Sequence, residues 1–254
     1  MDLTGKIALV TGGGTGIGKA ISEALADNGA HVAIASRNPS RFRSLAAPDG
    51  SILPVEMDIS KKDQVQKGVA AIVERWGPID ILVNNAGVSG ITRIDDADDR
   101  PWRDIVETNL TGTYLVTKEV LKSMKDHAGG RIVNVSSVLG KFGVPGYSAY
   151  CATKHGLIGF TRAVALEVVG RGITVNAICP GWVETEMARL GIEESAVYQG
   201  ITPEEFKRQA VSAVPIGRFL DAAEVAALVL YLVSEKAGGI TGQAINICGG
   251  QTMV

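Results

Sequence analysis

The stretch KIALVTGGGTGIG, residues 6–18, constrains the fold more than any other part of the chain. Residues 7–10 form a short apolar run typical of a buried strand, and a helical pattern begins near residue 17. The glycines between them let the backbone approach a phosphate at the N-terminus of the helix, where the helix dipole favours an anion. The stretch therefore predicts a strand, a phosphate-binding turn and a helix.

The spacing of these glycines distinguishes between phosphate-binding motifs. The common dinucleotide fingerprint, with glycines at n, n+2 and n+5, fails because the register from Gly12 ends at Ile17. The P-loop pattern nearly fits from Gly13, but Ala20 stands where a Ser or Thr should bind magnesium. The remaining glycines follow a threonine with the spacing n, n+4 and n+6: Gly12, Gly16 and Gly18.

Apolar runs and helical patterns alternate along the whole chain. The runs are rich in Val, Ile, Leu and Ala with little polar alternation, as in strands covered on both faces. Such alternation implies right-handed crossovers, so we expect one α/β domain, residues 1–254, with a doubly wound parallel sheet and helices on both faces. Strands are expected at 7–10, 31–36, 52–57, 79–84, 131–137, 173–179 and 243–248, and helices near 17–28, 61–75, 102–126, 148–169 and 222–234.

The segment 180–220 has the least regular pattern and contains Pro180, Pro203 and Pro215. A long irregular segment inside a compact domain often covers a functional site. We therefore expect a substrate lid at residues 182–215. Its apolar side chains suit a bulky or acyl-chain substrate better than a small polar sugar: Trp182, Met187, Leu190, Ile192, Tyr198, Ile201 and Phe206.

Composition and charge argue against several classes of protein. The 254 residues are 46% apolar and 20% charged, which argues against disorder, and the net charge of −2 gives little support for nucleic-acid binding. Cys151, Cys179 and Cys248 are far apart and match no metal or redox spacing. No apolar run approaches the ~20 residues of a membrane span, and the early strand leaves no room for a signal peptide. We therefore expect a cytoplasmic protein with reduced thiols, no metal, and no membrane or nucleic-acid partner.

Tyr150, Lys154 and Ser137 suggest proton transfer. Four residues is one helical turn, so the phenol and the ammonium share a helix face, whereas Tyr147 has only Cys151 at that spacing. Lowering a tyrosine pKa from ~10 to ~7 requires about 4 kcal/mol, which one cation ~4 Å away supplies at an effective dielectric of ~20. Ser137 ends a predicted strand and would bring a hydroxyl to the same place. The alternative is a surface pair, because Tyr-x-x-x-Lys also arises by chance.

Polar or flexible residues follow most of the predicted strands. In open parallel sheets, ligands bind beyond the carboxyl ends of the strands. These ends carry Ser36 and Arg37, then Asp58, residues 84–87, Ser137, and finally Pro180 and Gly181. The coincidence favours one binding site that includes Tyr150 and Lys154.

This ordered set resembles the short-chain dehydrogenase/reductase family, and the similarity covers residues 6–250. The resemblance implies a Rossmann fold and an NAD(P)-dependent oxidoreductase that needs no metal. The motifs appear in family order: Thr11, Gly12, Gly16, Ile17 and Gly18, then Asp58, then Asn84, Asn85, Ala86 and Gly87, then Asn109, Ser137, Tyr150 and Lys154, and last Pro180, Gly181 and Thr185.

The same resemblance implies a role for each site residue. Tyr150 would be the general acid in reduction and the base in oxidation, and Lys154 would lower its pKa and bind the nicotinamide ribose. Ser137 would hold the substrate carbonyl, and Asn109 would support a water relay to Lys154. Cofactor contacts are implied for Asp58 and Ile59 at the adenine, for Asn85, Ala86 and Gly87 along the cofactor, for Val183 and Thr185 at the carboxamide, and for Gly12, Thr15, Gly16, Ile17, Gly18, Pro180 and Gly181.

The end of the second strand bears on the choice of cofactor. NAD-specific proteins place an acid there to bind the ribose 2′-hydroxyl. Here Ser36-Arg37-Asn38 contains no acid, and Ser36 and Arg37 can bind a 2′-phosphate. NADP(H) is therefore the expected cofactor. NAD(H) is the alternative, because Thr15 stands where NADP-binding members often carry a second basic residue.

Four segments, 108–112, 172–176, 214–217 and 248–250, look similar to ketoacyl reductases of the fatty-acid and aromatic polyketide types. Residues 88–90, Val-Ser-Gly, depart from the Pro-Gly-Gly run of some polyketide reductases. We therefore expect NADPH-dependent reduction of a ketone such as a 3-oxoacyl thioester. The alternative is an NAD(P)-dependent dehydrogenase of a cyclic or secondary alcohol. A cofactor-binding sensor without chemistry is disfavoured, because the catalytic set is intact.

The similarity to ketoacyl reductases also suggests protein partners. An acyl carrier protein is acidic and would need a basic patch, for which Lys122, Lys125 and Arg171 are candidates, although Asp126 interrupts them. The family resemblance also implies a homotetramer, assembled through the two long helices that carry Asn109 and Tyr150, with the C-terminal strand at another interface.

Overall fold

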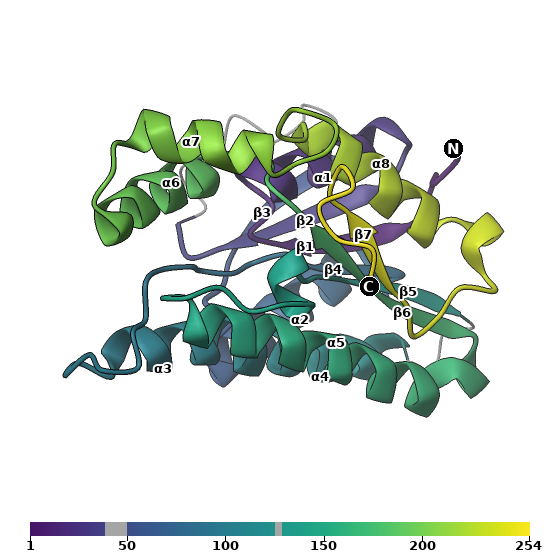
Figure 1. Cartoon of the computed structure of the whole chain (residues 1–254). Helices are drawn as coiled ribbons and strands as arrows, with labels where there is room; N and C mark the ends of the chain where they lie inside the picture. The colour runs from purple at the N-terminus through teal and green to yellow at the C-terminus, as the bar shows by residue number, and fades with distance from the viewer. Residues whose placement is uncertain (39–49, 125–128) are drawn as a thin grey trace.

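A parallel sheet forms the centre of the fold (Figure 1). The computed structural model describes residues 1–38, 50–124 and 129–254. Within these residues the strand order is β3-β2-β1-β4-β5-β6-β7, and every neighbouring pair is parallel. The strands are β1 Ile7–Thr11, β2 His31–Ser36, β3 Ile52–Glu56, β4 Ile81–Asn84, β5 Gly130–Val135, β6 Ile173–Pro180 and β7 Ala244–Ile247.

The doubly wound parallel sheet predicted from the sequence is confirmed. Each expected strand is present, with its ends shifted by at most two residues. The chain runs from β1 out to β3 and then returns to place β4 on the other side of β1. Ligands of open α/β sheets bind where the strand order reverses in this way, so the carboxyl ends of β1 and β4 mark the expected site.

Helices cover both faces of the sheet, as predicted. They are α1 Gly16–Asp27, α2 Lys62–Trp76, α3 Arg100–Val106, α4 Thr113–Ser123, α5 Ser148–Val168, α6 Glu186–Gln199, α7 Pro203–Ser212 and α8 Ala222–Val233. Successive side chains of a strand point to opposite faces. In β1, Ala8 and Val10 therefore pack with α1 and α8, whereas Ile7 and Leu9 pack with α2, α4 and α5 (Figure 1).

The single helix expected at 102–126 is instead divided. It consists of α3, the π-helical segment Glu107–Gly112 and α4, and residues 125–128 lie outside the described part. The π segment turns Asn109 against the loop after β4: the amide of Val88 donates to Asn109 Oδ1 and Asn109 Nδ2 donates to the Val88 carbonyl, both at 2.8 Å. The widened turn thus follows from a tertiary contact, and π turns often occur at functional sites.

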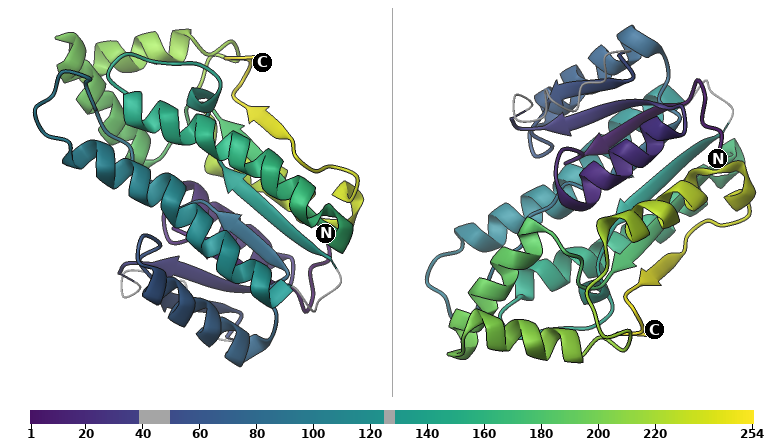
Figure 2. Two further views of the ribbon diagram at one scale, coloured as in Figure 1. Left: turned by 90° about the horizontal axis from the view of Figure 1, so that it is seen from below. Right: turned by 90° about the horizontal axis from the view of Figure 1, so that it is seen from above.

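The segment 180–220, expected to be irregular, is mostly helical. Proline does not interrupt these helices. Pro203 is the first residue of α7, where a missing N–H is tolerated. The hydroxyls of Thr185 and Thr202 cap α6 and α7. A small separate core joins the two helices: Ile192, Ala210 and Phe219 pack with Trp182, Phe206 and Val211. In Figure 2 this pair extends beyond the sheet as a distinct arm.

Two further expectations concern membranes and metals. Among the described residues, every helix is too short or too polar to cross a bilayer. The same part of the chain contains no cluster of His, Cys, Asp or Glu that could hold a metal ion. Of the expected basic patch, Lys125 and Asp126 lie outside the described residues.

Candidate active site

A cavity of about 580 Å³ lies at the carboxyl edge of the sheet. It runs from the glycine turn after β1, past the loop after β4, to the start of α5, with α6 and α7 on its outer side. Of the residues expected to have a catalytic or cofactor-binding role, only Gly18 and Asn109 are absent from its wall. The others line it together: Gly12, Thr15, Gly16, Ile17, Ser36, Arg37, Asp58, Ile59, Asn85, Ala86, Gly87, Ser137, Tyr150, Lys154, Pro180, Gly181, Val183 and Thr185.

The glycine turn has a shape that side chains would prevent. Gly12 and Gly16 have φ angles of 62° and 50°, in the left-handed region. Gly18 lies behind the turn, where a Cβ would be 2.2 Å from the Gly12 carbonyl oxygen. Thr15 precedes α1, and within the described residues its side chain makes no capping hydrogen bond. The first amides of α1 therefore remain available to an anion.

A threonine holds the loop after β4 against this turn. Thr11 Oγ1 accepts hydrogen bonds from the backbone amides of Asn85 and Ala86, each at 3.0 Å. In return, Asn85 Nδ2 donates to the carbonyl oxygens of Thr11 and Gly12, each at 3.1 Å. The two loops at the switch point are therefore fixed to each other, and this role of Thr11 and Asn85 could not be read from spacing alone.

At the other end of the cavity, Ser36 is the last residue of β2 and Arg37 follows it, and Asp58 lies two residues beyond β3. Arg37 is exposed, and within the described residues its guanidinium pairs with no carboxylate. Asp58 Oδ1 accepts hydrogen bonds from the amide and hydroxyl of Ser60, at 3.0 and 2.8 Å, a pattern that stabilises a turn. Contacts of Asp58 with an adenine remain a prediction.

Ser137, Tyr150 and Lys154 meet at the inner wall of the cavity. Ser137 lies two residues beyond β5, and its hydroxyl accepts from the Leu139 amide at 3.1 Å and is close enough to Tyr150 to influence the pKa of the phenol. Tyr150 and Lys154 are one turn apart on α5, and Lys154 Nζ lies 5.4 Å from the centroid of the tyrosine ring. Lys154 Nζ also donates to the Val135 carbonyl at 2.8 Å. The end of β5 therefore fixes the ammonium and places the Ser137 hydroxyl beside the phenol.

Burial controls the protonation of this group. It raises the pKa of Tyr150 to about 12, whereas the nearby Ser137 hydroxyl acts in the opposite direction. Burial also lowers the pKa of Lys154 to about 8. At pH 7 the phenol therefore holds its proton, and most lysine side chains remain charged. A tyrosine pKa lowered by the lysine remains a prediction.

Asn109 lies directly behind the cavity wall. Besides its two bonds to Val88, its Nδ2 donates to Thr153 Oγ1 of α5 at 3.3 Å. A Cβ on Gly87 would lie 3.2 Å from Asn109 Oδ1 and 3.7 Å from Lys154 Nζ, so the three residues are immediate neighbours. Asn109 thus ties the loop after β4 to α5, and the water relay expected for it stays a prediction.

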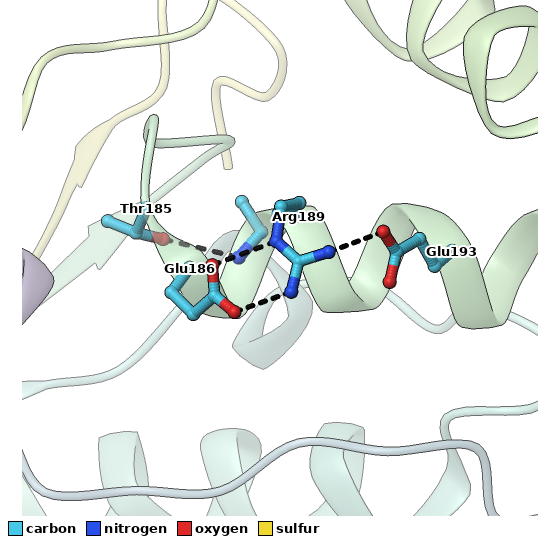
Figure 3. Close-up of polar contacts among 5 residues, drawn as sticks. Thr185, Glu186, Arg189 and Glu193 are labelled. Atoms are coloured by element: carbon cyan, nitrogen blue, oxygen red, sulfur yellow. Dashed lines mark hydrogen bonds and ion pairs between the residues drawn. The ribbon is translucent and has the colours of Figure 1, made fainter.

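Thr185 begins the outer wall of the cavity. Its Oγ1 accepts from the Ala188 amide at 3.2 Å and caps α6 (Figure 3). On the exposed side of α6, Arg189 bridges Glu186 and Glu193, as the dashed lines of Figure 3 show. Such exposed pairs add little stability, typically below ~1 kcal/mol each. The cap and the ion pairs together favour helix in a segment whose pattern was unclear.

Several cavity residues were not predicted from the sequence. Tyr147 lines the cavity although it lacks a lysine one turn later, and Phe142 and Gln251 reach it from the loop after β5 and from the C-terminal segment. A local spacing rule cannot find them, because each is brought there by the tertiary fold.

Comparison with known proteins agrees with the geometry. The model of the family described as short chain dehydrogenase matches residues 6–195. The 3-oxoacyl-(acyl-carrier-protein) reductase FabG of Vibrio cholerae is 37% identical over the full length of both chains. A crystal structure of a variant actinorhodin polyketide ketoreductase with NADPH is 42% identical, with a TM-score of 0.92 and 97% of each chain covered. Levodione reductase is 33% identical, with a TM-score of 0.91 and 98% of each chain covered.

The family expected from the ordered motifs is thereby confirmed. The family model covers well over half of the chain, and the relatives match it from end to end. The chain belongs to the short-chain dehydrogenase/reductase family and is an NAD(P)-dependent oxidoreductase acting on CH–OH or C=O groups.

Proposed function

We propose that the protein is an NADPH-dependent carbonyl reductase that reduces the ketone of a 3-oxoacyl thioester, with Tyr150 as general acid. The observation that carries this proposal is the meeting of Ser137, Tyr150 and Lys154 in the same cavity as the glycine turn. One space thus contains a proton donor, a hydroxyl able to bind a carbonyl oxygen, and a turn suited to a phosphate.

The residues present fit a nicotinamide dinucleotide. The turn at Gly12 and Gly16 leaves space that a Cβ would fill, because a Cβ on Gly16 would lie 3.2 Å from Thr185 Cγ2. The cavity continues from there to Asp58 on one side and to Tyr150 on the other. Gly12 to Gly18 would hold the pyrophosphate, Asp58 and Ile59 the adenine, and Val183 and Thr185 the carboxamide. When bound, the cofactor supplies the hydride.

The side chains of the site would bind the ketone oxygen, donate the proton and stabilise the resulting charge. The hydroxyls of Ser137 and Tyr150, which line the same cavity, would bind the ketone oxygen between them. Tyr150 holds its proton at pH 7 and would donate it to the oxygen as charge develops there. Lys154, charged at the same pH, would stabilise the phenolate left behind. Asn109 would keep α5 and the loop after β4 in register.

NADPH is preferred in this proposal because of the end of β2. Ser36 and Arg37 line the cavity there, and no acid stands beside them in Ser36-Arg37-Asn38. A guanidinium binds a phosphate through two hydrogen bonds and would not gain from a bare hydroxyl to the same degree. A relative crystallised with NADPH supports the same choice.

The thioester substrate is supported by the relatives and by the cavity wall. FabG of Vibrio cholerae is by name a 3-oxoacyl reductase of the acyl carrier protein. The outer part of the cavity is apolar, with Phe142, Val144, Met187, Trp182 and Phe206. Residues 182–215 would act as the lid over this part. A cytoplasmic homotetramer and docking of an acyl carrier protein remain predictions.

A second candidate function is the dehydrogenation of a cyclic or secondary alcohol. It is favoured by the likeness to levodione reductase, whose name includes neither a thioester nor a carrier protein. The same triad would serve, with Tyr150 acting as base.

A panel of substrates tests both functions. The absorbance of the reduced nicotinamide is followed with acetoacetyl thioesters, simple cyclic ketones and secondary alcohols, each with NADPH and with NADH. The first proposal expects the highest kcat/KM for the thioester with NADPH. Faster turnover of cyclic ketones or alcohols than of every thioester would select the second candidate instead.

A further inference from the structure

Tyr147 forms a buried contact between α5 and the lid segment. It stands at the N-cap of α5, three residues before Tyr150, and is only 8% exposed. Its hydroxyl hydrogen-bonds with Ser195 Oγ at 2.8 Å and donates more weakly to the Gly191 carbonyl at 3.4 Å. Ser195 belongs to α6 and is 4% exposed.

The contact belongs to one face of α6. Gly191, Ser195 and Tyr198 follow each other at helical spacing and all line the cavity. Tyr198 reinforces the contact, since a Cβ on Gly146 would lie 3.4 Å from its Cζ. At its other end α6 begins at Thr185, which touches the glycine turn. The helix thus spans the cavity from the cofactor end to the start of α5.

The α5 side of the contact is held independently of α6. Thr92 Oγ1 accepts from the Ala149 amide at 3.1 Å, and Ser148 Oγ donates to the Thr92 carbonyl at 2.7 Å. The Thr92 amide also donates to the Gly146 carbonyl at 2.6 Å. If the bond between Tyr147 and Ser195 is lost, α5 therefore stays in place, and α6 is the element that becomes free to move.

We propose that Tyr147 is a positioning residue that holds α6 as the substrate-side wall of the cavity. This role rests on the proposed carbonyl reduction but uses a different tyrosine from the acid. Without the hydroxyl, α6 samples open positions, and part of the binding free energy of the ketone is spent on closing it. The effect falls on substrate binding, because Tyr150, Lys154 and Ser137 are fixed by β5 and α5.

Steady-state kinetics of Tyr147→Phe and Ser195→Ala test this role. We expect KM for the ketone to rise about 3- to 10-fold, as loss of one hydrogen bond allows, with kcat within about twofold. The double variant is expected to match either single variant, because both remove the same bond. Effects that multiply in the double variant, or a loss confined to kcat, would overturn the proposal.

Hydrogen exchange gives a readout that needs no substrate. Amides of residues 186–199 are expected to exchange faster in Tyr147→Phe and Ser195→Ala than in the wild type, whereas those of 148–168 are unchanged. Tyr231→Phe, at an exposed tyrosine of α8, is the matched control and should show no change. Unchanged exchange in 186–199 would refute the role even in an active enzyme. Faster exchange would support it even if the reductase proposal failed.

Discussion

Replacing Lys154 by methionine should abolish activity and yet stabilise the protein. The side chain is 5% exposed, and burial lowers its pKa from 10.5 to about 8. That difference corresponds to about 3 kcal/mol by which the fold disfavours the charged lysine at pH 7. Methionine has a similar length and no charge. It gives up the 2.8 Å hydrogen bond to the Val135 carbonyl, worth ~1–2 kcal/mol.

The expected net gain at pH 7 is therefore about 1–2 kcal/mol. For a chain of this size, each kcal/mol raises Tm by ~2–4 °C, so Lys154→Met should melt about 2–8 °C higher. The stability difference between the variant and the wild type depends on pH. Above pH 8 the folded wild type loses the lysine proton while the unfolded chain still binds it, so wild-type stability rises relative to the variant between about pH 8 and 10.

Thermal unfolding of both proteins at pH 7, 8, 9 and 10 measures this difference. The Tm advantage of Lys154→Met should shrink steadily across the series, and Lys236→Met, at an exposed lysine, should show no such trend. A constant Tm difference from pH 7 to pH 10, or a variant clearly less stable at pH 7, would refute the claim that the lysine is held desolvated. Kinetics on the same samples should show at least a ~100-fold loss of kcat/KM.

Three further predictions follow from single contacts. Arg37→Ala should raise KM for NADPH about 10-fold and leave KM for NADH nearly unchanged, and equal changes for both cofactors would remove Arg37 from the 2′-phosphate site. Gly18→Ala should weaken the binding of both cofactors at least ~10-fold, because its Cβ would lie 2.2 Å from the Gly12 carbonyl oxygen and would distort the turn. Unchanged cofactor affinities, measured by titration, would contradict a role of this turn in binding. The reduction rate should fall as pH rises through about 8, where Lys154 loses its charge, and a flat kcat/KM profile from pH 6 to 10 would show that its charge is not used.

The sequence is most informative where structure follows from local pattern. Strands such as β1 and β6 are buried on both faces, so their apolar runs stand out, and the carboxyl ends of such strands share one edge of the sheet. That geometry is why the sequence pattern alone predicted that Ser137 and Tyr150 lie in the same site as the glycine turn. The predicted sheet and helical layers are accordingly confirmed.

The remaining features depend on contacts between distant segments. The π segment at Asn109 forms around bonds to Val88, 21 residues away, and the Tyr147 contact joins residues 48 apart. The sequence of α6 shows no clear helical periodicity, because polar and apolar residues are mixed along it. The Thr185 cap and packing against α7 stabilise the helix. Desolvation of Lys154 also reflects three-dimensional burial, which residue spacing does not report.

The central claim is that Tyr150 donates the proton that accompanies hydride transfer from NADPH to a ketone. It is tested most directly by the single-turnover rate of NADPH oxidation with a saturating acetoacetyl thioester, in wild type and in Tyr150→Phe. The variant keeps the ring but lacks the acidic hydroxyl, so its rate should fall by about 10²–10⁴-fold while NADPH still binds with similar affinity. A variant that retains more than about a tenth of the wild-type rate would contradict the assignment of Tyr150 as the acid.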